Sequence, residues 1–161
     1  MGMGHCYSHT GMIVEVGEDY VRVLEADGVK NKQVVERNWD KQAVYDKLNA
    51  NTMILLDFKI PDNQLLVTTR EKSIGLKYDY FTIFELAMIR FNRLFGKKMQ
   101  QTKKNPNVTP KLVDCSELMA RNIHILKGWD VKAIMNYSRF EQFTPQDIVT
   151  LYLKLKLLNQ V

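Results

Sequence analysis

Cysteine and histidine are scarce in this chain of 161 residues, which holds two cysteines, Cys6 and Cys115, and three histidines. Two cysteines are too few for a scaffold built on disulfide bonds, so reduced thiols are expected. The cluster of His5, Cys6 and His9 near the N-terminus is too loose to predict a metal site. We therefore expect neither a metal nor a cofactor.

Long apolar runs are also missing. The longest, such as "MILL" at residues 53–56, are far too short to cross a bilayer. The N-terminus lacks a basic stretch followed by an apolar core, which is the mark of a secretion signal. These absences predict a protein without a transmembrane segment, located in the cytoplasm or delivered by a route that needs no signal peptide, such as a phage particle.

The overall composition is typical of a globular protein. Hydrophobic residues make up 45% of the chain and charged residues 25%, and the length suits a single domain over residues 1–161. The net charge is +5, with lysines densest in "GKKMQQTKKN" at 96–105. We expect this segment to be a solvated loop, because no nucleic-acid-binding motif accompanies it. We therefore do not expect the protein to bind nucleic acid.

Strand patterns dominate the first third of the chain. Alternating residues at 9–16, a turn at "GED" and further alternation at 20–26 predict a β-hairpin. The other elements predicted for this part are a third strand within 29–39, a short helix at 40–49 and a buried strand at 52–60.

Helical patterns fill the remainder. Apolar residues at three- and four-residue spacings predict helices at 63–75 and 80–96. Capping signals predict two more, at 114–128 and 144–158. Strands followed by helices indicate an α+β fold.

Cys115 is expected to be the first residue of a helix capped by Asp114, with Glu117 three residues further on. The positive end of a helix dipole favours the reactive thiolate, and the N–H groups of the first turn are free to hold a developing oxyanion. Such a thiol still needs a base. Taken alone, these residues suit an ordinary buried cysteine at a helix start equally well.

His9 is the histidine best placed to serve as that base, since it opens a strand. His5 lies at the extreme terminus, and His124 lies in the middle of a helix, more than two turns beyond Cys115. We expect His124 to be a polar surface or half-buried side chain.

The hairpin register determines which acid reaches His9. If "GED" forms a three-residue loop, the ladder has three informative pairs: Val16 with Tyr20, Gly11 with Glu25, and His9 with Asp27. Directly opposite and diagonal partners both lie within reach of an imidazole. Glu25 and Asp27 therefore both stay open as the acid that orients His9.

The stretch "YSHTGMIVEVGEDYVRVLEADGV", followed much later by "DCSEL", resembles the circularly permuted branch of the NlpC-like cysteine peptidase superfamily, the YiiX/YaeF-like papain-fold hydrolases. Members of that branch carry a "SHxGI" strand with the catalytic histidine, an "EA…GV" strand and a later "CSEL" helix with the nucleophile. "GLKYDYF" at 75–81 and "FTPQDI" at 143–148 resemble two further family segments. The likeness extends from about Ser8 to Ile148.

The resemblance implies a papain-like, permuted NlpC-type fold in which an antiparallel sheet packs against helices. It implies Cys115 as the nucleophile, His9 as the general base and Glu25 as the residue that orients His9, with Asp27 as the rival. Three further residues would contact the substrate: Tyr78, Tyr80 and Ser116. Packing in the core is the alternative for the two tyrosines. Helix capping explains Ser116 equally well, and Cys6 matches no family position.

The implied activity is that of a cysteine hydrolase, an amidase or peptidase that cleaves amide bonds through an acyl-enzyme, with cell-wall peptides among the substrates of relatives. Relatives also act on lipids and small amides, so a lipid or small-molecule acyl hydrolase or acyltransferase is the first alternative. A non-catalytic papain-fold binding module is the second. Only eight residues precede His9, whereas family members usually carry a strand and a helix there that form one wall of the cleft.

Overall fold

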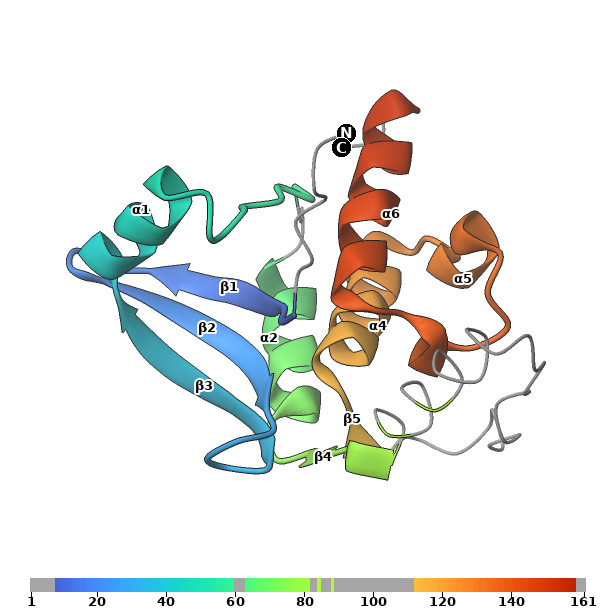
Figure 1. Ribbon diagram of the computed structural model, residues 1–161, viewed down its shortest axis with the longest axis horizontal. Coiled ribbons are helices and arrows are strands. Elements are labelled where there is room, and N and C mark those ends of the chain that lie inside the picture. The colour runs from blue at the N-terminus through green and yellow to red at the C-terminus, as the bar shows by residue number, and fades with distance from the viewer. Residues whose placement is uncertain (1–7, 60–62, 82–83, 85–87, 89–111, 159–161) are drawn as a thin grey trace.

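A curled sheet of five strands forms one side of the molecule, and helices pack against it (Figure 1). The structure is a computed structural model that describes residues 8–59, 63–81, 84, 88 and 112–158. Within these residues the strands come mainly first and most of the helices follow. The α+β class expected from the sequence is confirmed.

The strands lie in the sheet in chain order. They are β1 (Gly11–Val16), β2 (Tyr20–Asp27), β3 (Gln33–Asp40), β4 (Lys77–Tyr78) and β5 (Leu112–Val113). The first four pair antiparallel, but β4 and β5 run parallel. The sheet is therefore mixed, and the expectation of a wholly antiparallel sheet was wrong. The two-residue strands β4 and β5 are too short to leave a periodic signal in the sequence.

The β1–β2 hairpin has the expected register only at the end away from the turn. Gly11 pairs with Glu25, as predicted. A bulge in the middle of β1 then shifts the ladder by one residue, so Val16 pairs with Val21 rather than with Tyr20. Because the shift lies on the turn side of the bulge, the end of the hairpin beside His9 keeps the predicted geometry.

The helices of the described residues follow the capping signals closely. They are α1 (Lys41–Asn49), α2 (Asn63–Ser73), α4 (Cys115–Lys127), α5 (Val131–Met135) and α6 (Pro145–Leu157), with a short 3₁₀ helix η1 (Phe140–Gln142). In α6 the Thr144 hydroxyl accepts from the Asp147 N–H, and the Asp147 carboxylate accepts from the Thr144 N–H at 2.8 Å. Gly128 ends α4 in the left-handed conformation that glycine adopts without strain.

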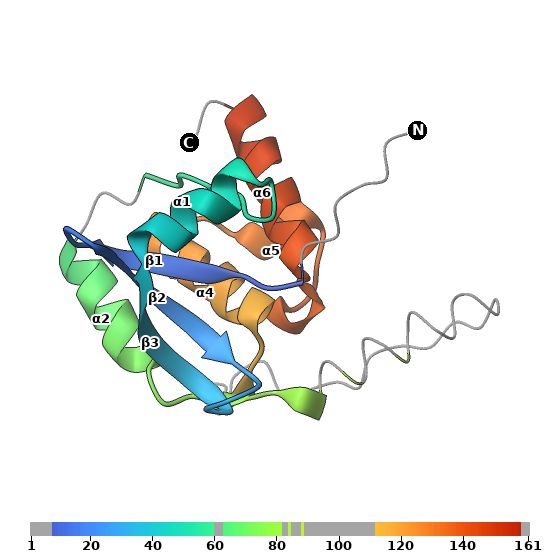
Figure 2. The same cartoon turned by 60° about the vertical axis from the view of Figure 1, so that its left-hand side comes forward.

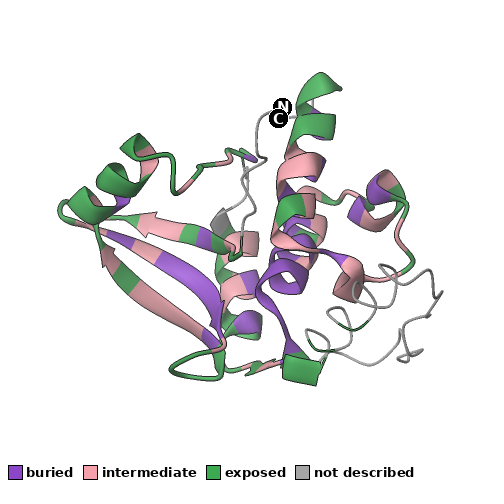
Figure 3. Cartoon of the chain, viewed as in Figure 1, coloured by how far each residue is buried: buried purple, intermediate pink, exposed green. Residues whose placement is uncertain are grey.

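Strand β2, between β1 and β3, is buried along most of its length and on both of its faces (Figure 3). On one face Leu24 and Ala26 belong to the main core, which α4 fills from the opposite side. On the other face Val21 and Val23 pack with Val44 of α1 in a smaller cluster. Figure 2 shows α4 behind the sheet, and it shows α1 on the opposite side of the β1–β2 hairpin from α4. This arrangement sets the start of α4 next to the open end of the hairpin.

The segment predicted as a buried strand at 52–60 is not a strand over residues 53–59. It crosses from α1 toward α2 as irregular backbone, with Phe58 buried and Leu55 64% exposed. Lys59 has a positive φ of 47°, which interrupts extended geometry. A short apolar run predicts burial without specifying a partner strand, and here the run packs side chains without joining the sheet.

Two predicted segments lie wholly or mostly outside the described residues, namely the helix at 80–96 and the basic loop at 96–105. Among the residues that the structure describes, no helix is long and apolar enough to cross a membrane.

Candidate active site

Cys115 is the first residue of α4, as the sequence predicts, and its side chain is buried. Asp114 has extended backbone angles, and its Oδ1 accepts from the N–H groups of Ser116 and Glu117 at 2.8 Å each. These two bonds satisfy donors that a helix start leaves open, so they fix where the helix begins. The cap therefore sets the position of the Cys115 sulfur.

The same cap limits which first-turn donors remain available. The N–H of Leu118 bonds to the Asp114 carbonyl oxygen at 3.0 Å, so Asp114 occupies three successive N–H groups. The expectation that the whole first turn is free for an oxyanion was wrong. The N–H of Cys115 itself is the donor that these contacts leave over.

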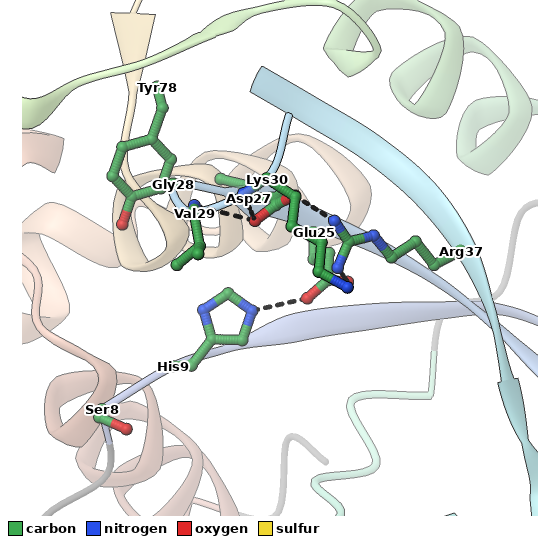
Figure 4. A pocket seen from close by; sticks show the side chains of 10 residues that line it. Ser8, His9, Glu25, Asp27, Gly28, Val29, Lys30, Arg37 and Tyr78 are labelled. Carbon is green, nitrogen blue, oxygen red and sulfur yellow. Dashed lines mark hydrogen bonds and ion pairs between the residues drawn. The ribbon is translucent and has the colours of Figure 1, made fainter. Parts of the chain in front are cut away.

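His9 joins β1 to the helix start. Its Nε2 lies 2.8 Å from Oε2 of Glu25, and the Glu25 side chain is buried whereas the His9 ring is partly exposed (Figure 4). The neighbouring Thr10 hydroxyl donates to the Cys115 carbonyl oxygen at 2.9 Å. Glu25 engages Nε2, so Nδ1 is the ring nitrogen that this contact leaves over.

Hydrogen bonds from the ring to the Cys115 sulfur and to Glu25 raise the pKa of His9 from 6.5 to about 10, against the opposing effect of burial. The ring is therefore protonated at neutral pH. A cationic imidazole between a sulfur and a carboxylate is the arrangement that stabilises a thiolate beside it. The structure thus brings together Cys115, His9 and Glu25, which the sequence places more than 100 residues apart at the extremes.

Asp27, the rival acid, has other partners. Its carboxylate accepts from the N–H groups of Val29, Lys30 and Asn31 in the β2–β3 turn and pairs with Arg37. Burial raises the pKa of Asp27, but these donors outweigh that effect and hold it at about 2. The geometry therefore assigns His9 to Glu25 and gives Asp27 to the turn.

Arg37 of β3 is a site residue that the sequence reasoning missed. Its guanidinium pairs with Asp27 and lies 3.7 Å from Oε1 of Glu25, so one cation faces both carboxylates. Figure 4 shows it approaching them from the side away from His9. In the observed register of β2 and β3, Arg37 lies opposite Val23, which places it diagonal to Glu25. Finding it required the register of the third strand.

The three predicted substrate contacts have different positions. Tyr78 lines a cavity beside His9, and burial followed by the charge of Cys115 raises its pKa. Tyr80 packs behind Tyr78 with ring centroids 5.0 Å apart and donates its hydroxyl proton to the Gly28 carbonyl oxygen. Ser116 is buried, and its hydroxyl donates to Asp114 at 2.9 Å. Ser116 thus serves the cap, and only Tyr78 faces the cavity.

The remaining histidines and the second cysteine are His124, His5 and Cys6. His124 is half-buried, with its Nδ1 on the Trp129 carbonyl oxygen. His5 and Cys6 lie outside the described residues. Within those residues, no group of three or more His, Cys, Asp or Glu side chains is arranged to hold a metal ion.

Two cavities meet at His9 and Glu25. The smaller, of about 390 Å³, is lined by the β2–β3 turn, Arg37 and Tyr78. The larger, of about 840 Å³, extends along β1 toward α1, the segment 52–59 and α6. The paired side chains of His9 and Glu25 therefore border open space on two sides.

Comparisons with protein-family models, with curated proteins and with solved structures found no match to this chain.

Proposed function

We propose that the protein is a cysteine hydrolase that cleaves an amide or ester bond through an acyl-enzyme on Cys115. The observation that carries the proposal is the 2.8 Å bond between His9 and the buried Glu25, together with the Cys115 side chain, which lies close enough to His9 to raise its pKa. Nucleophile, base and orienting acid in hydrogen-bonded series form the arrangement of covalent acyl-transfer catalysis.

The proposed reaction starts with the proton already on His9. The sulfur of Cys115 attacks the carbonyl carbon, and the electron pair of the carbonyl double bond moves to oxygen, where the N–H of Cys115 stabilises it. When the oxygen pair returns, the bond to the leaving group breaks and His9 donates its proton to the departing nitrogen or oxygen. Water, deprotonated by the neutral His9, then releases the acyl group and restores the thiolate.

We further propose that the chain adopts the permuted papain-like arrangement that its motifs resemble, in which the histidine strand precedes the cysteine helix. The support is the order of the site residues along the chain, with His9 and Glu25 on the hairpin and Cys115 at the start of α4. The strand that opens the hairpin lies against the helix that carries the thiol, joined by the bond from Thr10.

Hydrolysis of a short activated ester, para-nitrophenyl acetate, tests the proposed activity with the full chain. We expect turnover with an acetylated Cys115 intermediate in quenched reactions analysed by mass spectrometry. Cys115→Ala should reduce turnover by roughly 10³-fold or more. Cys6→Ser is the matched control and should retain the wild-type rate.

The same experiment separates the hydrolase from a papain-fold module without catalysis. A wild-type rate equal to that of Cys115→Ala, with no acetyl group on Cys115, would contradict the hydrolase and favour a binding module.

A further inference from the structure

The larger cavity, of about 840 Å³, follows the free edge of the sheet. β1 is the first strand of the sheet order and has a neighbouring strand, β2, on one side. On its other side the irregular segment 52–59 passes β1, and residues of both segments line the cavity (Figure 1). We call this space between β1 and residues 52–59 the edge groove.

Side chains from both faces of the sheet line the edge groove. Met12 of β1 belongs to the core on the α4 side, together with Met119 and Ile123 of α4. Ile13 pairs with Val23, which packs on the opposite face beside α1. One cavity reaches both faces because no other described strand lies beside the outer edge of β1. The edge groove is therefore apolar on either side of the plane of the sheet.

The main chain along this edge has unused hydrogen-bonding groups. The N–H and C=O groups of a strand point alternately to its two sides, so β2 can pair with only part of those in β1. Among the residues that the structure describes, no backbone group outside β2 bonds to the main chain of residues 11–16. The outward groups of β1 are thus available to a further strand.

β1 has little of the protection that edge strands commonly carry. Lysine, proline and β-bulges are the usual means of preventing another chain from pairing with an edge. The sequence of β1 contains neither lysine nor proline, and its bulge lies between Ile13 and Glu15, on the side of the turn. The regular half, Gly11–Ile13, is the half that adjoins His9.

Apolar side chains on both walls of the edge groove remain partly uncovered. Val16 of β1 is 61% exposed, and Leu55 on the opposite wall is 64% exposed. Uncovered apolar side chains that lie together commonly mark a surface that binds a partner.

An extended polypeptide segment matches these features. Its main chain supplies the N–H and C=O groups that an edge strand lacks, which is how β-strand addition gives affinity. Its side chains alternate between the two faces, so they reach the apolar walls on both sides of the sheet. A compact apolar molecule would cover the walls but would leave the outward groups of β1 without partners.

The wall opposite β1 argues against a second folded copy as the occupant. A copy that paired its own β1 here would bring its own segment 52–59 and its own sheet to the same place. A single extended segment needs no such room.

Charge indicates the flanks of the bound segment. Among the described residues that line the edge groove, the charged side chains beyond His9 and Glu25 are Lys47, Lys59, Lys127 and Asp57. The excess of cations favours acidic residues at the ends of the segment.

We propose that the edge groove binds an extended segment of another polypeptide, which adds to the sheet beside β1 and directs apolar side chains to both faces. The segment carries apolar residues at successive positions and acidic residues at its ends. This binding does not depend on the proposed hydrolase activity.

A peptide titration tests the proposal. The probe is Glu-Val-Leu-Val-Ile-Glu, amidated at its C-terminus and labelled with fluorescein at its N-terminus. Fluorescence anisotropy follows its binding to the full chain as Cys115→Ala, which lacks the proposed nucleophile. We expect saturable binding. Leu55→Glu in the same background should weaken it by about tenfold or more, because a charge replaces an apolar wall.

Leu153→Glu is the matched control. Leu153 is also an exposed leucine, but it does not line the edge groove. The affinity for the peptide should stay unchanged in this variant. An equal loss of binding in Leu153→Glu and Leu55→Glu would overturn the assignment to the edge groove.

Two N-methylated forms of the peptide test pairing by the main chain. One is methylated on both valines and the other on the leucine and the isoleucine, so each blocks the N–H groups on one side of the strand. The form blocked on the side that faces β1 should bind about tenfold or more weakly, and the other should bind like the unmodified peptide. Equal affinities for the two forms would overturn strand pairing.

Amide hydrogen exchange provides a readout on the protein itself. The N–H groups of residues 11–16 that point away from β2 should exchange more slowly when the peptide is bound. Unchanged exchange along β1 would overturn the proposal, as would a peptide that does not bind. Sedimentation of the protein without peptide tests the other occupant: a dimer that Leu55→Glu dissociates would assign the edge groove to a second copy and overturn the proposal.

Discussion

His9 is the residue that joins the two halves of the site, because it contacts an acid on β2 and the nucleophile on α4. Its raised pKa depends first on the Cys115 sulfur and then on Glu25. Glu25 in turn is buried and faces Arg37 at 3.7 Å. The imidazole thus lies beside a buried carboxylate that the fold holds in place.

Glu25→Gln should lower the pKa of His9 and slow ester hydrolysis by roughly tenfold or more, because the amide keeps the shape of the side chain but loses the charge that favours imidazolium. The His9 ring titration, followed by NMR, and kcat/KM for the acetyl ester measure the two effects.

Asp27→Asn is the matched control for that variant. It should leave the His9 titration close to that of the wild type, because Asp27 bonds to the turn and to Arg37. A larger shift of the His9 pKa in Asp27→Asn than in Glu25→Gln would contradict the assignment of Glu25.

At the scale of the element, the start of α4 carries both a helix cap and the proposed nucleophile. Asp114 fixes the first turn, and Glu117 lies fully buried behind it, where Arg121 pairs with it at 2.7 Å. The other carboxylate oxygen of Glu117 has no hydrogen-bond partner among the residues that the structure describes. Burial raises the pKa of Glu117 to about 7, although Arg121 opposes this shift.

Asp114→Ala should lower the free energy of unfolding by about 1–2 kcal/mol, through loss of the cap, and should also slow hydrolysis, because the first turn positions the nucleophile. Urea unfolding and ester kinetics measure the two effects. Asp130→Ala removes the cap of α5, where Asp130 accepts from the Ala133 N–H. It should reduce stability without changing kcat, and full activity in Asp114→Ala would show that the cap has no catalytic part.

Glu117→Gln should gain stability relative to the wild type as pH rises from about 4.5 to about 7. The folded chain binds the Glu117 proton more tightly than the unfolded chain, so the wild type loses stability across this window. Urea unfolding at several pH values measures the difference, with Glu71→Gln on the exposed side of α2 as control. A difference that does not change with pH would contradict the buried, proton-binding carboxyl.

At the scale of the whole molecule, His9 and Thr10 link the first strand to the helix that begins at residue 115. Thr10 bonds to the Cys115 carbonyl oxygen, and the Cys115 side chain is the largest cause of the raised pKa of His9. These contacts hold the start of the sheet against α4. The contribution of His9 to them depends on the charge of its ring. The stability of the fold is therefore expected to depend on pH.

The wild type should lose stability relative to His9→Gln as pH rises from about 6.5 toward about 10. Because the pKa of His9 is raised in the folded state, its contribution is fully present below 6.5 and is lost as pH passes through the folded value. Urea unfolding of both proteins across this range measures the change. Parallel stability profiles for the two proteins would contradict the raised pKa.

The sequence predicts much of this architecture where the signal is local. The hairpin end beside His9, the Asp114 cap and the α6 capping box follow from neighbouring residues. The bulge that moves Val16 and the irregular path of 53–59 do not, because both depend on which partner the rest of the chain provides. Tertiary packing overrides the local pattern there.

In the site, too, some features follow from neighbouring residues and others depend on tertiary packing. Cys115 and His9 carry recognisable motifs, and the choice of Glu25 over Asp27 required the structure, since both satisfy the predicted ladder. Arg37 was missed because its role depends on a third strand. The occupation of first-turn N–H groups by Asp114 also appears only in three dimensions.

The most direct test of the account is the rate of Cys115 alkylation by iodoacetamide as a function of pH, measured in a Cys6→Ser background with His9 intact and with His9→Asn. With His9 intact, we expect rapid reaction at neutral pH, well below the range of a free thiol near about 8.5. His9→Asn should return the profile to that of a free thiol. Identical profiles for the two proteins would contradict a thiolate–imidazolium pair and, with it, the proposed hydrolase.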